Sequence, residues 1–349
     1  GNSGRGAHEA SLDASRLIYE TREMLSELFN LGDPRQVAFT LNSTEALNTA
    51  ILGLFDPGDH IISTVMEHNS VLRPLYRLEE KGCQVSFVPC DEKGRLRTDL
   101  LESFLKENTK ALVCTHASNL TGNANDLMYL GRFCKDHGLL FVVDASQTAG
   151  VLPIDMQAMN IDVVCFTGHK GLYGPQGTGL LLCGQTPPPL LEGGTGSESI
   201  RQEMPDFLPD RLEAGTHNIA GIAGLLEGLR FVEKQGVQSI GSHERALTVQ
   251  MGESLAQLPG VEVFRSKDPS QQAGVLSFRV SGMDCEELGE ALGRRDIALR
   301  SGLHCAPLAH RTAGTLETGT VRASVSAFNV PQEIPRFVRE LRQILTEKP

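Results

Sequence analysis

The chain has 349 residues, 40% of them hydrophobic and 21% charged, with a formal net charge of −11. This composition is typical of a globular protein with room for two domains, and it excludes a disordered or fibrous chain. The negative charge argues against nucleic-acid and anionic-membrane partners, and the apolar runs are far shorter than the roughly 20 residues of a membrane helix.

The first 30 residues are expected to form an arm and a helix. The stretch 1–8 is too rich in glycine for a regular element, and it begins abruptly, as though an earlier segment were missing. Residues 11–29 place apolar side chains at helical spacing and are followed by the stop signals Gly32 and Pro34. We expect this region, residues 1–30, to pack with the smaller of two domains.

Residues 31–235 alternate between strand-like and helix-like runs. A repeated strand-helix-strand rhythm predicts a mainly parallel sheet with helices on both faces. We therefore expect a large α/β domain here. The expected strands are 37–40, 60–65, 84–88, 111–115, the runs 138–147 and 162–171, and 178–183; the expected helices begin near 42, 69, 98, 129 and 220.

The rhythm changes after residue 235. Two short strands now follow one another, and helices lie before and after them. This order is typical of an α+β unit, so we expect a smaller C-terminal domain over residues 236–349. Its expected helices are 242–258, 285–294 and 332–347, and its expected strands are 261–264 and 274–280.

Two buried strands of the large domain end in ionisable side chains. Asp144 ends one apolar run, and Lys170 follows the next in a Gly-rich turn. A core would not accept the acid unpaired. An anion facing the pyridine nitrogen and a lysine forming a Schiff base are what pyridoxal 5′-phosphate (PLP) requires, and fold-type I enzymes have this layout. Taken singly, Asp144 could be a strand-end cap and Lys170 a surface lysine.

Two further strand ends carry polar groups. Ser43 and Thr44 open a helix whose free N–H groups could bind phosphate, although a simple N-cap at Asn42 explains the same residues. His68 follows a strand at the edge where open α/β sheets bind ligands, so its ring could stack on a cofactor. A lone histidine is more often a structural or surface residue.

Seven short motifs, in order along nearly the whole chain, resemble the class V aminotransferases of fold-type I. More narrowly, they are similar to the branch of cysteine desulfurases and selenocysteine lyases. The motifs are Glu-His-Asn-Ser (67–70), His-Ala-Ser-Asn (116–119), Asp-Ala-Ser-Gln (144–147), Thr-Gly-His-Lys (167–170), Glu-Ala-Gly-Thr (213–216), Arg-Ser-Gly-Leu-His-Cys-Ala (300–306) and Val-Arg-Ala-Ser (321–324).

The resemblance implies PLP as the cofactor and assigns its contacts. Lys170 would form the Schiff base, Asp144 would partner the pyridine nitrogen, Gln147 would bind the ring hydroxyl, and His68 would stack on the ring. The phosphate would be held by Ser43, Thr44, Thr167 and His169, and by Thr216 lent across a homodimer interface.

The resemblance also implies the substrate contacts. Asn119 would touch cofactor or substrate, and Arg322 would pair with the substrate carboxylate, for which a planar bidentate donor is suited. Cys305 would be the nucleophile that accepts sulfur, with Lys170 moving the Cα proton and His68 assisting. No metal ligand set is expected.

The sequence thus predicts a cysteine desulfurase that converts L-cysteine to L-alanine and leaves a persulfide on Cys305, with a sulfur-acceptor protein as a possible partner. The eight cysteines lack paired spacing, and apolar runs hold four of them (Cys114, Cys134, Cys165, Cys183), which indicates a reducing compartment, expected to be the cytoplasm. The alternatives are a selenocysteine lyase, another class V aminotransferase or PLP lyase in which Cys305 is incidental, and a non-catalytic PLP-binding scaffold.

Overall fold

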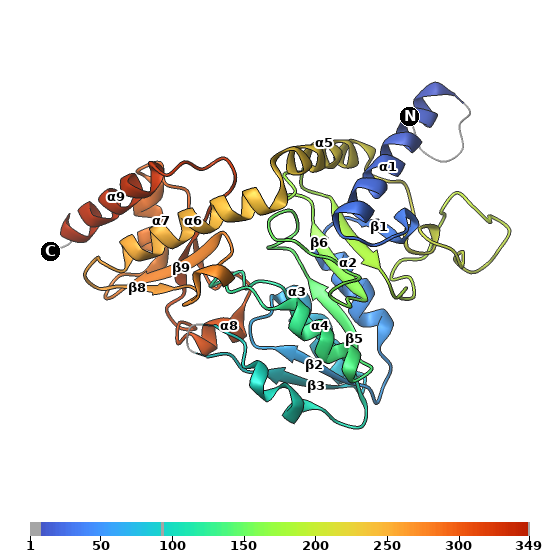
Figure 1. Cartoon of the computed structure of the whole chain (residues 1–349), viewed down its shortest axis with the longest axis horizontal. Helices are drawn as coiled ribbons and strands as arrows, with labels where there is room; N and C mark the ends of the chain where they lie inside the picture. Colours follow the sequence, from blue (N-terminus) through green and yellow to red (C-terminus); the bar gives the residue numbers. More distant parts are fainter. Residues whose placement is uncertain (1–7, 92–93, 348–349) are drawn as a thin grey trace.

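The computed structural model describes residues 8–91 and 94–347, and it contains a seven-stranded and a four-stranded sheet (Figure 1). The expectation for the Gly-rich start lies outside the described residues, apart from His8, whose ring Nδ1 caps the first helix by accepting from Ser11 N. Among the described helices, none is long and apolar enough to cross a membrane.

The large sheet has the strand order β1-β7-β6-β5-β4-β2-β3. The pairs β2–β3, β2–β4, β4–β5 and β5–β6 are parallel, as the strand-helix rhythm predicts. The strands are β1 (Val37–Thr40), β2 (His60–Thr64), β3 (Gln84–Val88), β4 (Thr109–Thr115), β5 (Leu140–Asp144), β6 (Val163–Thr167) and β7 (Gly179–Cys183).

Strand β7 runs against its neighbours. It pairs antiparallel with both β6 and β1. The connection from β6 to β7, residues 168–178, contains no helix. A parallel return needs a crossover of a dozen or more residues, so this short turn-rich link reverses the chain. The link carries Lys170.

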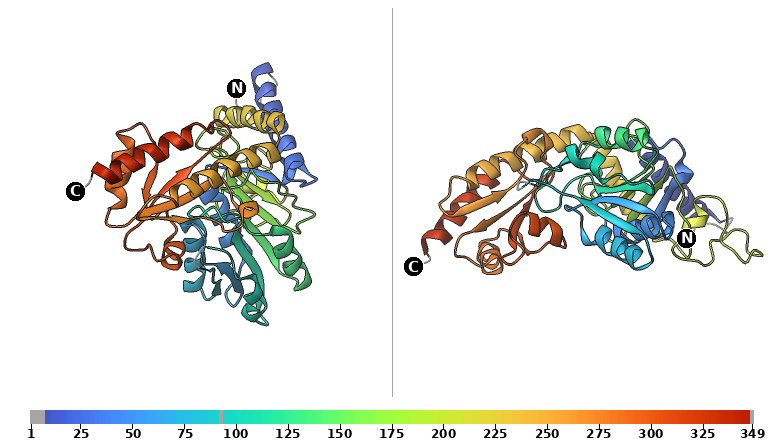
Figure 2. Two further views of the ribbon diagram at one scale, coloured as in Figure 1. Left: turned by 60° about the vertical axis from the view of Figure 1, so that its left-hand side comes forward. Right: turned by 90° about the horizontal axis from the view of Figure 1, so that it is seen from below.

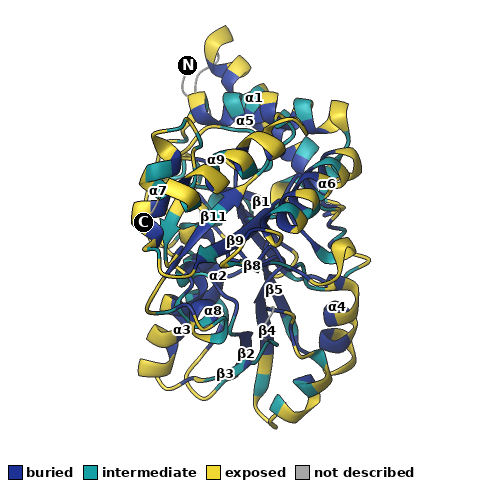
Figure 3. Ribbon diagram, turned by 90° about the vertical axis from the view of Figure 1, so that its left-hand side faces the viewer, coloured by how far each residue is buried: buried dark blue, intermediate teal, exposed yellow. Residues whose placement is uncertain are grey.

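Both faces of the large sheet are covered by helices. Alternate strand residues point to opposite faces, so Val143 and Phe166 join one core while Val142 and Cys165 join the other. One core is closed by α1 (Glu9–Leu28), α4 (Leu127–Asp136) and α5 (Ile219–Gln235), and the other by α2 (Ser43–Leu54) and α3 (Asn69–Glu80). Figure 3 shows the dark, buried strands between helices with exposed outer faces.

The expected packing of the N-terminal helix is wrong. Helix α1 lies on α5 and next to β1, and its buried Ile18 and Leu25 belong to the core of the large sheet (Figure 1). The physical reason is that its apolar face packs into the core shared with α5, and that Arg22 forms a buried ion pair with Glu213, Nη2 to Oε2 at 2.7 Å. The division between residues 235 and 236 stays a prediction.

The small sheet is antiparallel, with the order β10-β11-β9-β8. Its own core includes side chains from the helices α6, α7 and α9. Figures 1 and 2 show the small sheet with these helices beside it. The elements are α6 (Val237–Leu255), β8 (Val261–Phe264), β9 (Val275–Val280), α7 (Cys285–Gly293), β10 (Arg300–Gly302), α8 (Pro307–Thr312), β11 (Thr320–Ser324) and α9 (Glu333–Glu347). The sequence did not predict β10, β11 or α8. With three and six residues, β10 and α8 are too short for a clear periodicity, and the residues of β11 were singled out only as a motif.

Four 3₁₀ segments, η1 (Pro34–Gln36), η2 (Thr98–Phe104), η3 (Asp210–Leu212) and η4 (Pro269–Gln271), complete the described elements. Of these, η2 replaces the α-helix that was expected near residue 98. Arg97, the N-cap residue that precedes η2, makes no side-chain capping hydrogen bond, which leaves the start of a longer helix unsupported.

Candidate active site

The ends of β4, β5 and β6 meet at one edge of the large sheet. Thr115 is the strand partner of Asp144, and Asp144 is the partner of Cys165. Asp144 is buried, and its Oδ1 accepts hydrogen bonds from Ser146 N (2.9 Å) and Ser146 Oγ (2.5 Å). Among the described residues, nothing donates to Oδ2, so this oxygen is available to a ligand.

Lys170 stands three residues beyond the end of β6. Its side chain remains accessible to solvent. The surrounding protein nevertheless lowers the pKa of its amine, first through desolvation and then through repulsion by Arg322 and Arg300, while the Asp144 carboxylate opposes the change. A lowered pKa increases the fraction of free amine, which a nucleophile or general base needs.

His68 caps the start of α3. Its Nδ1 accepts from Ser70 N at 3.0 Å and lies 3.0 Å from Ser70 Oγ, which fixes the ring. Burial lowers the pKa of His68, Asp144 raises it, and Lys170 lowers it further. His68, Asp144 and Lys170 thus lie within electrostatic reach of one another; we call these three residues the strand-end group.

Hydroxyl groups gather beside the strand-end group. Ser70 Oγ also hydrogen-bonds Thr44 Oγ1 at 2.8 Å, next to Ser43, the first residue of α2. On the β6 side, Thr167 Oγ1 lies 2.7 Å from His169 Nδ1. The expected N-cap is also present, because Asn42 Oδ1 accepts from Glu45 N at 3.0 Å. Hydroxyls and N–H groups at a helix start suit a phosphate.

Two arginines face each other on the small sheet. Arg300 of β10 is the strand partner of Arg322 of β11. Desolvation, followed by the charge of Arg300, lowers the pKa of Arg322 to about 10, while Cys305 acts in the opposite direction. Like charges directly opposed on a sheet are unfavourable, so this pair calls for an anion between or beside them.

Asn119 connects the two sheets. It is buried in the loop after β4, and its side-chain Nδ2 donates to the His304 carbonyl at 2.7 Å. Its own carbonyl accepts from Arg322 Nη1 at 3.2 Å. Buried Asn119 Oδ1 and Arg322 Nε have no hydrogen-bond partner among the described residues. Since buried polar atoms are normally paired, a polar ligand is expected to contact them.

Cys305 lies in a strained turn, residues 303–306, which we call the cysteine loop. His304 and Cys305 have φ angles of 48° and 57°, a left-handed conformation that costs a residue with a Cβ about 1–2 kcal/mol. Cys305 is exposed, whereas Cys90 is half-buried and the other six cysteines are buried. The Cys305 thiol is therefore the most accessible of the eight cysteine thiols, and it interacts electrostatically with Arg322.

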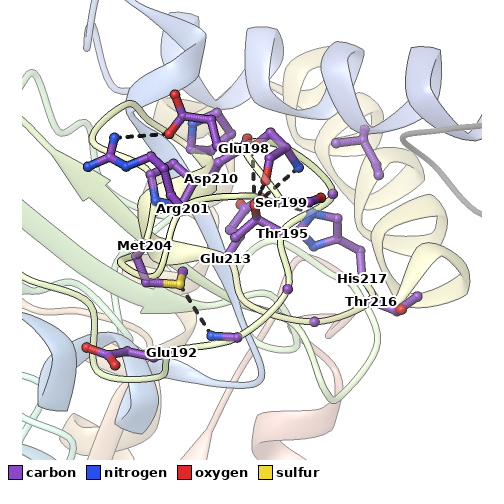
Figure 4. A pocket seen from close by; sticks show the side chains of 18 of the residues that line it. Glu192, Thr195, Glu198, Ser199, Arg201, Met204, Asp210, Glu213, Thr216 and His217 are labelled. Carbon is purple, nitrogen blue, oxygen red and sulfur yellow. Dashed lines mark hydrogen bonds and ion pairs between the residues drawn. The ribbon is translucent and has the colours of Figure 1, made fainter.

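Gln147 and Thr216 are placed differently. Gln147 is half-buried, one residue beyond Ser146 and thus close to Asp144 in the chain. Thr216 is exposed and lines a separate cavity of about 1010 Å³ between α1 and the loop 192–217, together with Arg22 and Glu213 (Figure 4). In the part of the chain that the structure describes, Thr216 is not among the groups around Lys170.

Three residues that help to build the site are absent from the predicted cofactor and substrate contacts. Ser70 joins His68 to Thr44, and Arg300 opposes Arg322. Glu67 is fully buried; its Oε1 accepts from Thr64 Oγ1 (2.5 Å) and Thr115 N (3.0 Å), and desolvation raises its pKa to about 8. The only available signal was their position within motifs 67–70 and 300–306.

These residues fit PLP. A buried carboxylate with a free oxygen and an amine of lowered pKa match the ring nitrogen and the aldehyde of this cofactor, and hydroxyls at a helix start match its phosphate. The unpartnered Asn119 Oδ1 and Arg322 Nε leave polar groups for an amino-acid substrate.

Comparison with known proteins agrees with this geometry. The family Aminotransferase class-V matches residues 1–337 of the chain. A probable cysteine desulfurase of Methanothermobacter thermautotrophicus is 35% identical, over 98% of this chain and 87% of its own length. Another, from Pyrococcus abyssi, is 34% identical over 99% of this chain and 87% of its own.

Solved structures agree as well. The apo structure of a cysteine desulfurase from Thermococcus onnurineus superposes with a TM-score of 0.92 at 32% identity, covering 99% of this chain and 88% of that one. The S-sulfonic acid form of the cysteine desulfurase CsdA from Escherichia coli has a TM-score of 0.88 at 29% identity, with the same coverage of 99% and 88%.

Proposed function

Because the chain belongs to the class V aminotransferase family and has the predicted α/β, fold-type I architecture, we propose that it is a PLP-dependent cysteine desulfurase. Its substrate is L-cysteine, and its products are L-alanine and a persulfide on Cys305. The observation that carries the proposal is the convergence of Lys170, Asp144, Arg322 and the exposed Cys305 on one site between the two sheets.

The strand-end group would hold the cofactor. Lys170 would bind its aldehyde carbon, Asp144 would pair with its ring nitrogen, and His68 would stack on the ring. Gln147 would contact the ring hydroxyl. The hydroxyls of Ser43, Thr44 and Thr167, with His169, would bind the phosphate. When bound, PLP draws electrons away from the substrate Cα, which makes its proton acidic.

Arg322 orients the substrate. Its guanidinium binds the carboxylate bidentately, which also relieves the repulsion from Arg300. The free amine of Lys170 would take the Cα proton and later return a proton to the product. Desolvation and the neighbouring arginines lower the pKa of Lys170 from its usual value, which increases the share of the free-base form that this transfer requires.

Cys305 then removes the sulfur. Its thiolate attacks the substrate sulfur, so a sulfur–sulfur bond forms while the carbon–sulfur bond breaks. The bonding electron pair stays with the substrate carbon, which takes up a proton and leaves as the methyl group of alanine. Cysteine and the enzyme thiol thus become alanine and an enzyme persulfide, and no external oxidant or reductant is needed.

The assembly and the setting are part of the proposal. Thr216 lies away from the strand-end group of its own chain. This placement agrees with a homodimer in which Thr216 would bind the cofactor phosphate in the site of the partner subunit. A sulfur-acceptor protein would take the persulfide sulfur from the exposed loop. The unpaired cysteines are consistent with a cytoplasmic enzyme.

Product analysis tests the proposal. Purified protein loaded with PLP is given L-cysteine, L-selenocysteine, or an amino acid with a keto acid, and alanine, sulfide and selenide are measured. We expect alanine and sulfide in equal amounts from cysteine with a thiol reductant. Amino-group exchange without sulfide would instead establish an aminotransferase, and turnover of selenocysteine alone would establish a selenocysteine lyase.

A further inference from the structure

Two consecutive carbonyl groups of the cysteine loop are held by the large-sheet side of the site. Asn119 Nδ2 donates to the His304 carbonyl at 2.7 Å. The backbone N–H of Asn69, in the first turn of α3, donates to the Cys305 carbonyl at 2.8 Å. The nucleophile is therefore fixed by two residues that are far away in the sequence, and one of them, Asn69, directly follows His68.

The side chain of His304 adds a third attachment. Its Nε2 lies 3.0 Å from Thr320 Oγ1 and 3.2 Å from the Thr320 carbonyl, at the start of β11. Burial, with repulsion from Arg322, lowers the pKa of His304 to about 3. The ring is thus neutral at physiological pH, and its Nε2–H donates to Thr320.

The cysteine loop depends on these attachments because its backbone is strained. His304 and Cys305 both adopt positive φ angles although neither is glycine. Within the loop itself, one backbone hydrogen bond, from Ala306 N to the Leu303 carbonyl at 3.0 Å, closes the turn. Strain of this kind persists only where surrounding contacts over-determine it, and it is concentrated at functional sites.

Asn119 also contacts Arg322, the arginine proposed to bind the substrate carboxylate. Its carbonyl accepts from Arg322 Nη1, while its side-chain nitrogen is committed to His304. This orientation of the amide is required, because a carbonyl oxygen can only accept. Asn119 Oδ1 therefore points elsewhere, and it is buried without a donor among the described residues. One residue thus links the arginine, the cysteine loop and the space for substrate.

We propose that Asn119 is the positioning residue for the nucleophile, setting Cys305 relative to the substrate bound by Arg322. The catalytic consequence rests on the proposed desulfurase function, whereas the anchoring of the loop does not. This role is distinct from a contact to cofactor or substrate, since it uses one N–H of the side-chain amide on the His304 carbonyl and leaves Oδ1 and the second N–H to a ligand.

Asn119→Asp is the direct test, because aspartate has the same shape but cannot donate to the His304 carbonyl. Asn125→Asp is the matched control: Asn125 lies in the same loop and its Nδ2 donates to the Thr115 carbonyl at 2.8 Å, away from the cysteine loop. Hydrogen–deuterium exchange of the peptide 300–306 is measured in the PLP-loaded proteins. If Asn119→Asp does not fold, Asn119→Ser removes the same donor.

We expect exchange in peptide 300–306 to be at least fivefold faster in the Asn119 variant and within twofold of wild type in Asn125→Asp. With cysteine as substrate, kcat should fall at least tenfold while KM stays within threefold. Equal exchange in Asn119→Asp and wild type, or an equal increase in both variants, overturns the proposal. Should wild type not desulfurate cysteine, the proposed function fails, and the exchange comparison still decides the anchoring.

Discussion

The strand-end group and the cysteine loop form opposite sides of the same site, and they are built in opposite ways. His68, Asp144 and Lys170 follow buried parallel strands, and local hydrogen bonds from Ser70 and Ser146 fix two of them. His304 and Cys305 sit in a strained turn fixed by distant residues. The residues proposed to hold the cofactor are thus positioned by the core of the large sheet, whereas the thiol proposed to carry sulfur is positioned by a few hydrogen bonds to its loop.

Lys170→Ala should have the largest effect, because it removes an essential member of the strand-end group. We expect turnover of cysteine to fall by about 10³-fold or more, since both the cofactor attachment and the proton transfer are lost. Borohydride reduction followed by peptide mapping should mark Lys170 in the wild type. The exposed Lys135 gives a matched control, Lys135→Ala, which should keep full activity. A reduced cofactor found on another lysine would contradict the assignment.

Cys305→Ser tests the other side of the site alone. Sulfide release from cysteine should fall by roughly 10²-fold or more, because a hydroxyl is a far weaker nucleophile for sulfur. The visible absorbance of the bound cofactor should be unchanged, since Cys305 is not in the strand-end group. Cys83→Ser is the control, because its hydroxyl can keep the bond that Cys83 Sγ gives to the Asp56 carbonyl. Wild-type turnover in Cys305→Ser would remove this thiol from the reaction.

Arg322→Lys should have a moderate effect, confined to substrate binding. Lysine keeps the charge but loses the planar, bidentate geometry, so we expect KM for cysteine to rise about tenfold with a smaller change in kcat. Arg279→Lys, on the neighbouring strand β9, is a control for general damage to the small sheet. A lower kcat at unchanged KM would mean that Arg322 acts on the chemistry rather than on the carboxylate.

Glu67→Gln should produce the smallest effect, seen as a pH dependence of stability. The pKa of Glu67 is about 8 in the fold and near 4.5 when exposed, so the folded protein holds a proton that the unfolded chain releases. Its contribution to stability is therefore present below pH 4.5 and is lost as the pH rises towards 8. The wild type should lose more stability than Glu67→Gln between pH 5 and 8 in urea unfolding. Parallel curves would show that Glu67 is charged in the fold.

The sequence predicted the strand-end group better than the cysteine loop for a physical reason. Apolar strands ending in Asp144 and near Lys170 leave a local pattern, and parallel strand ends meet at one edge. The contact from Asn119 to His304 leaves no such pattern, because it joins residues that are far apart in the sequence. The left-handed backbone conformation of His304 and Cys305 has no sequence signature either, since neither of these two residues is glycine.

The wrong prediction for the packing of the N-terminal helix has the same cause, because contacts between distant residues leave no local sequence pattern. Its amphipathic spacing predicted the helix correctly, but not which apolar face it would cover. The position of the helix is fixed by its packing on α5 and by the ion pair between Arg22 and Glu213, two residues that are far apart in the chain. Similarly, β7 reads as another buried strand, and only the helix-free link before it fixes its reversed direction.

The central claim is that a lysine-held cofactor releases sulfur from cysteine directly onto Cys305. It is tested most directly by giving the PLP-loaded protein one equivalent of L-cysteine without reductant, and then measuring alanine and the masses of the cysteine-containing peptides. We predict one alanine per site and one additional sulfur atom on the Cys305 peptide alone. Alanine formed without sulfur on Cys305, or sulfur on a different cysteine, would contradict the account.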